Sequence, residues 1–172
     1  MHPVTAAALI AVALFSVRPV AQSQALPDFS GTWNIDRERS ESPHQGETFT
    51  PTTYVVTQTA TEVTIETRRG SARDTVEYPI GPSTSPPPPA AAAPDAKRAT
   101  RAYWSGRSLV TEGLRTIQGQ TVSLRETRTL NAAGTEMTLQ TLLVVQHGYT
   151  LKGAQNYGTA TDIYRRVTPE PR

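Results

Sequence analysis

The chain of 172 residues contains no cysteine. This absence excludes disulfide bridges, thiolate metal sites and a cysteine nucleophile. Histidine is scarce as well: three occur in the whole chain, and two of them, His44 and His147, follow the N-terminal segment in polar, turn-like sequence. Serine-hydrolase, zinc-protease and phosphate-loop motifs are also missing. We therefore expect a protein that is not an enzyme, holds no metal or cofactor, and is stabilised by its hydrophobic core alone.

An excess of charge of one sign is missing too. The formal net charge is +2, and Arg18 is the one charged side chain in residues 1–25, which leaves 16 Lys and Arg against 15 Asp and Glu in residues 26–172. The arginines are scattered along the chain, without a basic stripe or cluster. We therefore expect no nucleic-acid partner.

A long apolar run occurs only near the N-terminus, at residues 4–17. It is short for a membrane span, and Ser23-Gln24-Ala25 places small residues where a signal peptidase would cleave. The sequence predicts a signal peptide at residues 1–25 and a periplasmic or secreted domain at residues 26–172, not membrane-spanning once processed. An N-terminal membrane anchor is the alternative, because no Lys or Arg precedes the apolar run.

Alternation of apolar and polar residues dominates the rest of the chain, without a long helical stripe. This pattern predicts an all-β fold, an antiparallel up-and-down barrel of about eight to nine strands. We expect strands at 29–36, 52–59, 62–68, 75–80, 98–104, 108–118, 121–130, 135–146 and 159–167.

A Pro/Ala-rich, low-complexity segment at residues 81–97 separates two groups of these strands. Proline cannot donate to a sheet ladder, so we expect this segment to be an extended surface insertion within one domain. The alternative is a lid or docking segment.

Turn sequences predict which strand face is buried. A two-residue turn at residues 119–120 pairs Gln118 with Thr121, and a turn at residues 131–134 pairs Leu130 with Thr135. Both turns place most aliphatic residues on the same face, which we therefore expect to be the inner one.

Three charged residues share this predicted inner face: Arg115, Glu126 and Arg128. A buried charge needs a partner, and Glu126 can pair with either arginine. The remaining positive charge would then orient an anionic or phenolic ligand in a partly apolar pocket. A mutually satisfied structural cluster is the alternative. The predicted ligand-binding residues are Tyr54, Val56, Ile65, Tyr78, Trp104, Thr111, Arg115, Leu124, Glu126, Arg128 and Leu139.

The segment Asp28-Phe29-Ser30-Gly31-Thr32-Trp33 opens the first predicted strand. It resembles the opening of bacterial secreted lipocalin-like domains, of the calycin group. The resemblance implies structural roles for Gly31 and for Trp33, which would plug one barrel end. In lipocalins an arginine of the last strand packs over this tryptophan. Arg165 is the first candidate, because it shares a face with Ile163 and Val167, and Arg166 is the second.

The sequence departs from the related fatty-acid-binding proteins at two points. Their closing strand carries an arginine of the carboxylate clamp where this chain has Asp162. Residues 37–51 are also too few, and too poor in apolar periodicity, for their helix-turn-helix lid. A fatty-acid carrier with that clamp is therefore disfavoured.

These observations together favour non-catalytic binding of a small, partly apolar molecule in the cell envelope. The first alternative is an envelope interaction or structural module whose barrel is filled by its own side chains. The second is an enzyme that works through Arg115, Glu126 and Arg128. The size of the internal cavity distinguishes a carrier from a filled module.

Overall fold

The computed structural model describes residues 25–44, 50–82, 100–117, 120–145 and 157–168. Residues 1–24 and 83–99 lie outside this description. The signal peptide and most of the Pro/Ala-rich insertion therefore stay predictions.

Nine strands form in the described residues, one at each predicted position. They are β1 (Gly31–Ile35), β2 (Thr52–Gln58), β3 (Glu62–Arg69), β4 (Ala72–Pro79), β5 (Arg101–Ser105), β6 (Ser108–Ile117), β7 (Gln120–Leu130), β8 (Glu136–Val145) and β9 (Tyr157–Arg166). Two short 3-10 helices, η1 (Arg37–Arg39) and η2 (Ser42–His44), follow β1.

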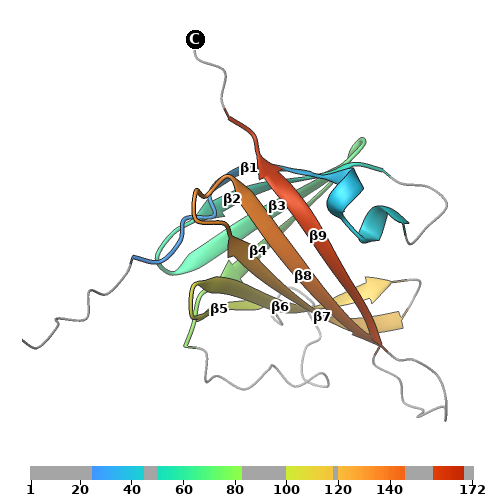
Figure 1. Ribbon diagram of the computed structural model, residues 1–172. Coiled ribbons are helices and arrows are strands. Elements are labelled where there is room, and N and C mark those ends of the chain that lie inside the picture. Colours follow the sequence, from blue (N-terminus) through green and yellow to red (C-terminus); the bar gives the residue numbers. More distant parts are fainter. Residues whose placement is uncertain (1–24, 45–49, 83–99, 118–119, 146–156, 169–172) are drawn as a thin grey trace, which may run out of the picture.

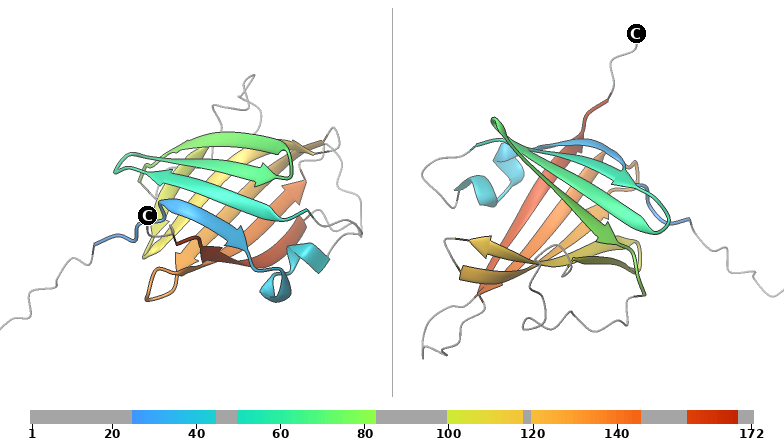
Figure 2. Two further views of the ribbon diagram at one scale, coloured as in Figure 1. Left: turned by 90° about the horizontal axis from the view of Figure 1, so that it is seen from above. Right: turned by 180° about the vertical axis from the view of Figure 1, so that it is seen from behind.

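The strands make one antiparallel sheet in the order β4-β3-β2-β1-β9-β8-β7-β6-β5, which curls into a nearly closed barrel (Figures 1 and 2). Nine strands that alternate in direction leave both edge strands pointing the same way. The closing contact is accordingly a parallel bridge, between Ile80 and Ala102. The amide of Gly81 supports it by donating to the Ala102 carbonyl at 2.9 Å. The predicted fold class, an antiparallel up-and-down barrel, is confirmed.

Both predicted hairpin registers are wrong by two residues. Ile117 pairs with Gln120, and Leu130 pairs with Met137. The second loop is longer than predicted because the Asn131 side-chain oxygen accepts the amides of Thr135 and Glu136, at 3.0 and 3.2 Å. A shift of two residues preserves the strand face, so the predicted inner face of β6, β7 and β8 is still the buried one.

Trp33 plugs one end of the barrel and is fully buried. The guanidinium of Arg166 stacks over its ring at 4.3 Å and donates hydrogen bonds to the carbonyls of Asp28 and Gly134, at 2.9 and 2.8 Å. Gly31 has φ 129°, and a Cβ there would lie 3.1 Å from Nη1 of Arg166. The Gly-x-Trp spacing therefore leaves room for the arginine that covers the tryptophan.

The prediction that Arg165 covers Trp33 is wrong. Strand register places Arg166 opposite Trp33, while Arg165 points outward and pairs with Asp36. The buried face of β9 carries Asp162 and Tyr164, not Ile163 and Val167. The apolar pattern misled here because a carboxylate occupies an inner position of the strand, where it is hydrogen-bonded.

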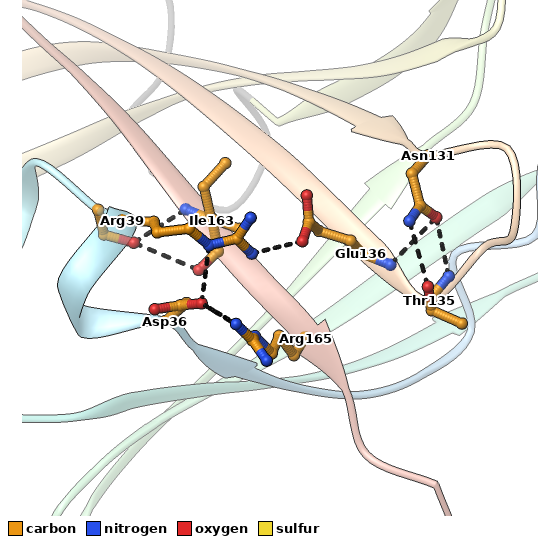
Figure 3. Close-up of polar contacts among 8 residues, drawn as sticks. Asp36, Arg39, Asn131, Thr135, Glu136, Ile163 and Arg165 are labelled. Atoms are coloured by element: carbon orange, nitrogen blue, oxygen red, sulfur yellow. Dashed lines mark hydrogen bonds and ion pairs between the residues drawn. The ribbon is translucent and has the colours of Figure 1, made fainter.

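Residues 36–44 follow β1 along the edge of β9, where the amides of Asp36 and Glu41 donate to the carbonyls of Ile163 and Thr161 at 2.7 and 3.0 Å (Figure 1). Asp36 accepts hydrogen bonds from Arg39 and Arg165, and Arg39 also pairs with Glu136 of β8 (Figure 3). The hydroxyl of Ser40 accepts the amide of Ile163 at 2.9 Å, as a neighbouring strand's carbonyl would. These contacts fix the segment that leads to η2.

Candidate ligand-binding cavity

A cavity of about 720 Å³ occupies the half of the barrel away from Trp33. Its position follows from strand register, since its lining residues continue the inner faces of the strands beyond the residues packed around Trp33. The lining residues are Ile35, Ser42, Thr50, Thr52, Tyr54, Thr67, Arg69, Ala72, Arg73, Asp74, Arg115, Leu124, Glu126, Leu139, Thr141, Leu143, Asp162 and Tyr164.

Two neighbouring tyrosines form part of the cavity floor. The rings of Tyr54 and Tyr164 lie 4.9 Å apart between centroids and are tilted by 38° to each other. Burial, together with the negative charge of Glu126, raises the pKa of Tyr54 to about 12. Burial also raises the pKa of Tyr164. Both phenols are therefore neutral at physiological pH and can donate or accept hydrogen bonds.

The floor also contains one end of an ion pair. Nη2 of Arg128 lies 2.5 Å from Oε2 of Glu126, and Nη1 donates to Thr111 Oγ1 at 2.7 Å. The Arg128 side chain is fully buried beneath the floor, and its guanidinium lies 5.7 Å from the centre of the Tyr54 ring. Burial acts to lower the pKa of Arg128, but the adjacent Glu126 outweighs it and the pKa is raised. Arg128 therefore stays charged and neutralises the carboxylate above it.

The cavity wall contains both hydroxyls and aliphatic groups. Leu124 and Leu143 are neighbours across β7 and β8, and the threonines Thr52, Thr67 and Thr141 lie on three other positions of the wall. Such a surface suits a ligand that has both apolar area and hydrogen-bonding groups.

Asp162 is buried at the cavity wall and is fully engaged by η2. Its two carboxylate oxygens accept the amide and the hydroxyl of Ser42, at 2.9 and 2.5 Å. This pair fixes η2 beside the open end of the barrel, so Asp162 has a structural role there. It occupies the position where the fatty-acid clamp would require an arginine.

Three arginines reach the rim of the cavity from different strands. Arg69 donates to Thr52 Oγ1 at 3.2 Å, and Arg73 pairs with Glu66 at 3.0 Å. Arg115 makes two long contacts, 3.4 Å to the Tyr78 hydroxyl and 3.5 Å to Asp74. The rim therefore offers positive charge to an acidic group.

Five of the predicted ligand-binding residues line the cavity: Tyr54, Arg115, Leu124, Glu126 and Leu139. The other six pack in the filled part of the barrel or beneath the floor: Val56, Ile65, Tyr78, Trp104, Thr111 and Arg128. Arg115 is thus separated from the Glu126–Arg128 pair, and the three charges do not form the single cluster that the sequence predicted. Glu126 and Arg128 pair with each other, whereas Arg115 reaches the rim.

The lining residues that the sequence analysis missed are mostly at strand ends. Thr52, Thr67 and Asp74 continue the inner faces of their strands beyond the last apolar residue. Following the two-residue alternation to the end of each strand would have found them. Tyr164 and Asp162 were missed because the face of β9 was reversed.

Within the described residues, no three His, Asp or Glu side chains are grouped so that they could hold a metal ion. In the same part of the chain, no helix has the length and apolar character needed to cross a membrane.

The strand order matches the barrel expected from the alternation pattern, and an arginine of the last strand, Arg166, stacks over the Gly-x-Trp tryptophan as the resemblance of the first strand implies. The fold is calycin-like.

No family model matches the sequence, and no curated protein matches it significantly. Among solved structures, the chain is similar to a point mutant of the fluorescent protein UnaG, with a TM-score of 0.44 and 16% sequence identity. The similarity covers 81% of this chain and 96% of that one.

Proposed function

We propose that the protein binds a small, partly apolar molecule in the open half of its barrel and does not act as a catalyst. The observation that supports this proposal is the cavity of about 720 Å³, a size typical of small-molecule sites. Its wall combines leucines with threonine hydroxyls, and its floor presents two neutral phenols beside a neutralised carboxylate.

The alternative function, an interaction module, requires a barrel whose whole interior is filled by side chains. Side chains fill the barrel interior only as far as the layer of Tyr54, Leu139 and Tyr164, and the cavity begins beyond that layer. The enzyme alternative requires Arg115, Glu126 and Arg128 to act on one substrate. Arg128 lies beneath the floor and is not a cavity-lining residue, which argues against this alternative.

The test measures binding of the neutral fluorescent probe N-phenyl-1-naphthylamine to the purified protein and to two matched variants. Thr141→Phe introduces a ring into the cavity, whereas Gln140→Phe introduces the same ring at the adjacent, exposed position of β8. We expect Thr141→Phe to weaken binding at least tenfold and Gln140→Phe to leave it within twofold. Equal binding by all three proteins would place the probe outside the cavity and contradict the proposal.

We also propose that the protein works in the periplasm or outside the cell, on the support of the apolar run at residues 4–17 and the small residues at 23–25. N-terminal sequencing of the protein from its source cells should then find Leu26 as the first residue. Recovery of the chain with Met1 in the membrane fraction would favour the anchor alternative.

A further inference from the structure

Among the residues that the structure describes, the barrel wall is incomplete on the side where β4 faces β6. Strand β5 pairs with β6 only from Ser108 to Glu112, so the part of β6 from Gly113 onward has no strand partner on that side among the described residues. Closure between the sheet edges comes from the bridge at Ile80 and from Thr100, whose hydroxyl donates to the Glu77 carbonyl at 2.9 Å. Beyond these contacts, the described part of the wall has a slot between β4 and β6.

The cavity reaches this slot. Ala72, Arg73 and Asp74 of β4 and Arg115 of β6 all belong to the cavity lining. Among the described residues, the hydrogen bonds and ion pairs that join β6 to β4 all come from Arg115, which contacts Asp74 and the hydroxyl of Tyr78. A ligand in the cavity therefore meets Arg115 at the place where the wall is held by side chains only.

The contacts of Arg115 are weak ones. Its distances to Asp74 and Tyr78 are 3.5 and 3.4 Å, whereas charge-assisted hydrogen bonds are usually about 2.7–2.9 Å. Both partners of the ion pair are partly exposed, with a third of the Arg115 side chain and two thirds of the Asp74 side chain accessible. Water screens such a pair, and exposed pairs contribute little. The guanidinium can therefore exchange Asp74 for another acid without a large loss.

The other cavity arginines differ in their surroundings. Arg73 is paired with Glu66 at 3.0 Å on the outer side of the β3–β4 hairpin, and Arg69 donates to the hydroxyl of Thr52. In the described residues neither of them lies within ion-pair distance of an acid that lines the cavity. Arg115 is distinguished from both because its acidic partner, Asp74, is itself a cavity-lining residue.

We propose that Asp74 determines how strongly the cavity selects acidic ligands, because it competes with the ligand's acidic group for Arg115. This inference rests on the proposed function and adds the ligand class: a small molecule with an apolar body and one acidic group, which lies at the β4–β6 slot. The Asp74–Arg115 pair sets the preference, since removal of the aspartate charge releases the guanidinium for the acidic group of the ligand.

The experiment compares two probes of one skeleton. 8-Anilinonaphthalene-1-sulfonate carries an acidic group, and N-phenyl-1-naphthylamine is its neutral counterpart. Asp74→Asn should raise the affinity for the sulfonate roughly two- to fivefold, the range of an exposed ion pair, and leave the affinity for the neutral probe unchanged. Glu77→Gln is the matched control, because it removes the same charge from the exposed outer face of the same strand. We expect it to change neither affinity by more than the error.

A second background separates competition from simple repulsion. In a protein that carries Arg115→Gln, the substitution Asp74→Asn should no longer improve sulfonate binding beyond the Glu77→Gln level. The inference would be overturned if Asp74→Asn still raised the affinity for the sulfonate in the protein without Arg115. It would also be overturned if Glu77→Gln raised that affinity as much as Asp74→Asn does. In both cases, binding of the neutral probe would show that the cavity itself is intact. Failure of both probes to bind the unaltered protein would overturn the proposed function and the inference with it.

Discussion

The two halves of the barrel are built by the same strands but are filled differently. Along β2, the inner residues run from Val56 beside the plug, through Tyr54 at the floor, to Thr52 in the cavity. Along β8, Leu139 at the floor is followed by Thr141 in the wall. In β2 the inner residues become more polar from the plug toward the open end, and in β8 the wall beyond the floor alternates a threonine with Leu143. The contrast shows that alternation selects the inner face, while the position along the strand decides whether that face is packed or lines a cavity.

The largest expected effect is in the filled half. Trp33→Ala should lower the free energy of unfolding by about 3–5 kcal/mol, because a fully buried indole leaves a cavity and frees the stacked Arg166. Leu143→Ala, in the half-buried wall of the open half, should cost about 1 kcal/mol. Urea denaturation of both variants measures the difference. Equal losses would mean that the two halves are packed alike.

The second prediction concerns the boundary between the halves. Glu126→Leu should cost about 3 kcal/mol, since it leaves the buried Arg128 without its carboxylate. The double variant Glu126→Leu/Arg128→Leu should recover much of that loss, because it removes the unpaired charge as well. A double-mutant cycle of urea unfolding free energies measures this coupling. Additive losses would show that the pair is not a coupled unit of the floor.

The smallest expected effect is on the outer side of the β3–β4 hairpin, beside the open half. Hydrogen bonds from Arg68 and Arg73 lower the pKa of Glu66 from 4.5 to about 2. A lowered carboxyl pKa contributes stability that is present above about pH 4.5 and is lost as the pH falls toward 2. Because these side chains are exposed, the effect should be a small one.

Glu66→Gln should therefore flatten the acid side of the profile of unfolding midpoint against pH, compared with the unaltered protein. Glu77→Gln removes an exposed carboxylate of the neighbouring strand β4 and should leave the acid side as it was. An unchanged profile for Glu66→Gln would contradict the pairing of Glu66 with Arg68 and Arg73.

The strand pattern could be predicted from the sequence because each strand alternates strongly and because the turns contain glycine, asparagine or polar residues. The inner faces of β6, β7 and β8 were predicted correctly although both registers were wrong, since a shift of two residues leaves each side chain on the same face of its strand. The length of the loop before β8 could not be predicted, because it depends on how the Asn131 side chain bonds the backbone amides that follow it.

The candidate site was predicted only in part. Tyr54, Leu124 and Leu139 were found from apolar alternation, and Arg115 and Glu126 from their place on the same face. The face of β9 was predicted wrongly, because hydrophobicity alone would assign Ile163 to the inner face and Asp162 to the outer one. The structure has Asp162 inside. Only the tertiary contact with Ser42, 120 residues away in sequence, makes the aspartate acceptable inside.

Arg166 has a consequence for the order in which the chain can fold. Its guanidinium reaches carbonyls up to 138 residues earlier in the chain, and it covers the tryptophan of the first strand. Contacts of such long sequence separation slow folding, because the chain must close a large loop before they form. The hydrophobic core at the plugged end cannot be completed until the C-terminal strand has been synthesised. A growing chain therefore carries an unshielded Trp33 until β9 has been synthesised.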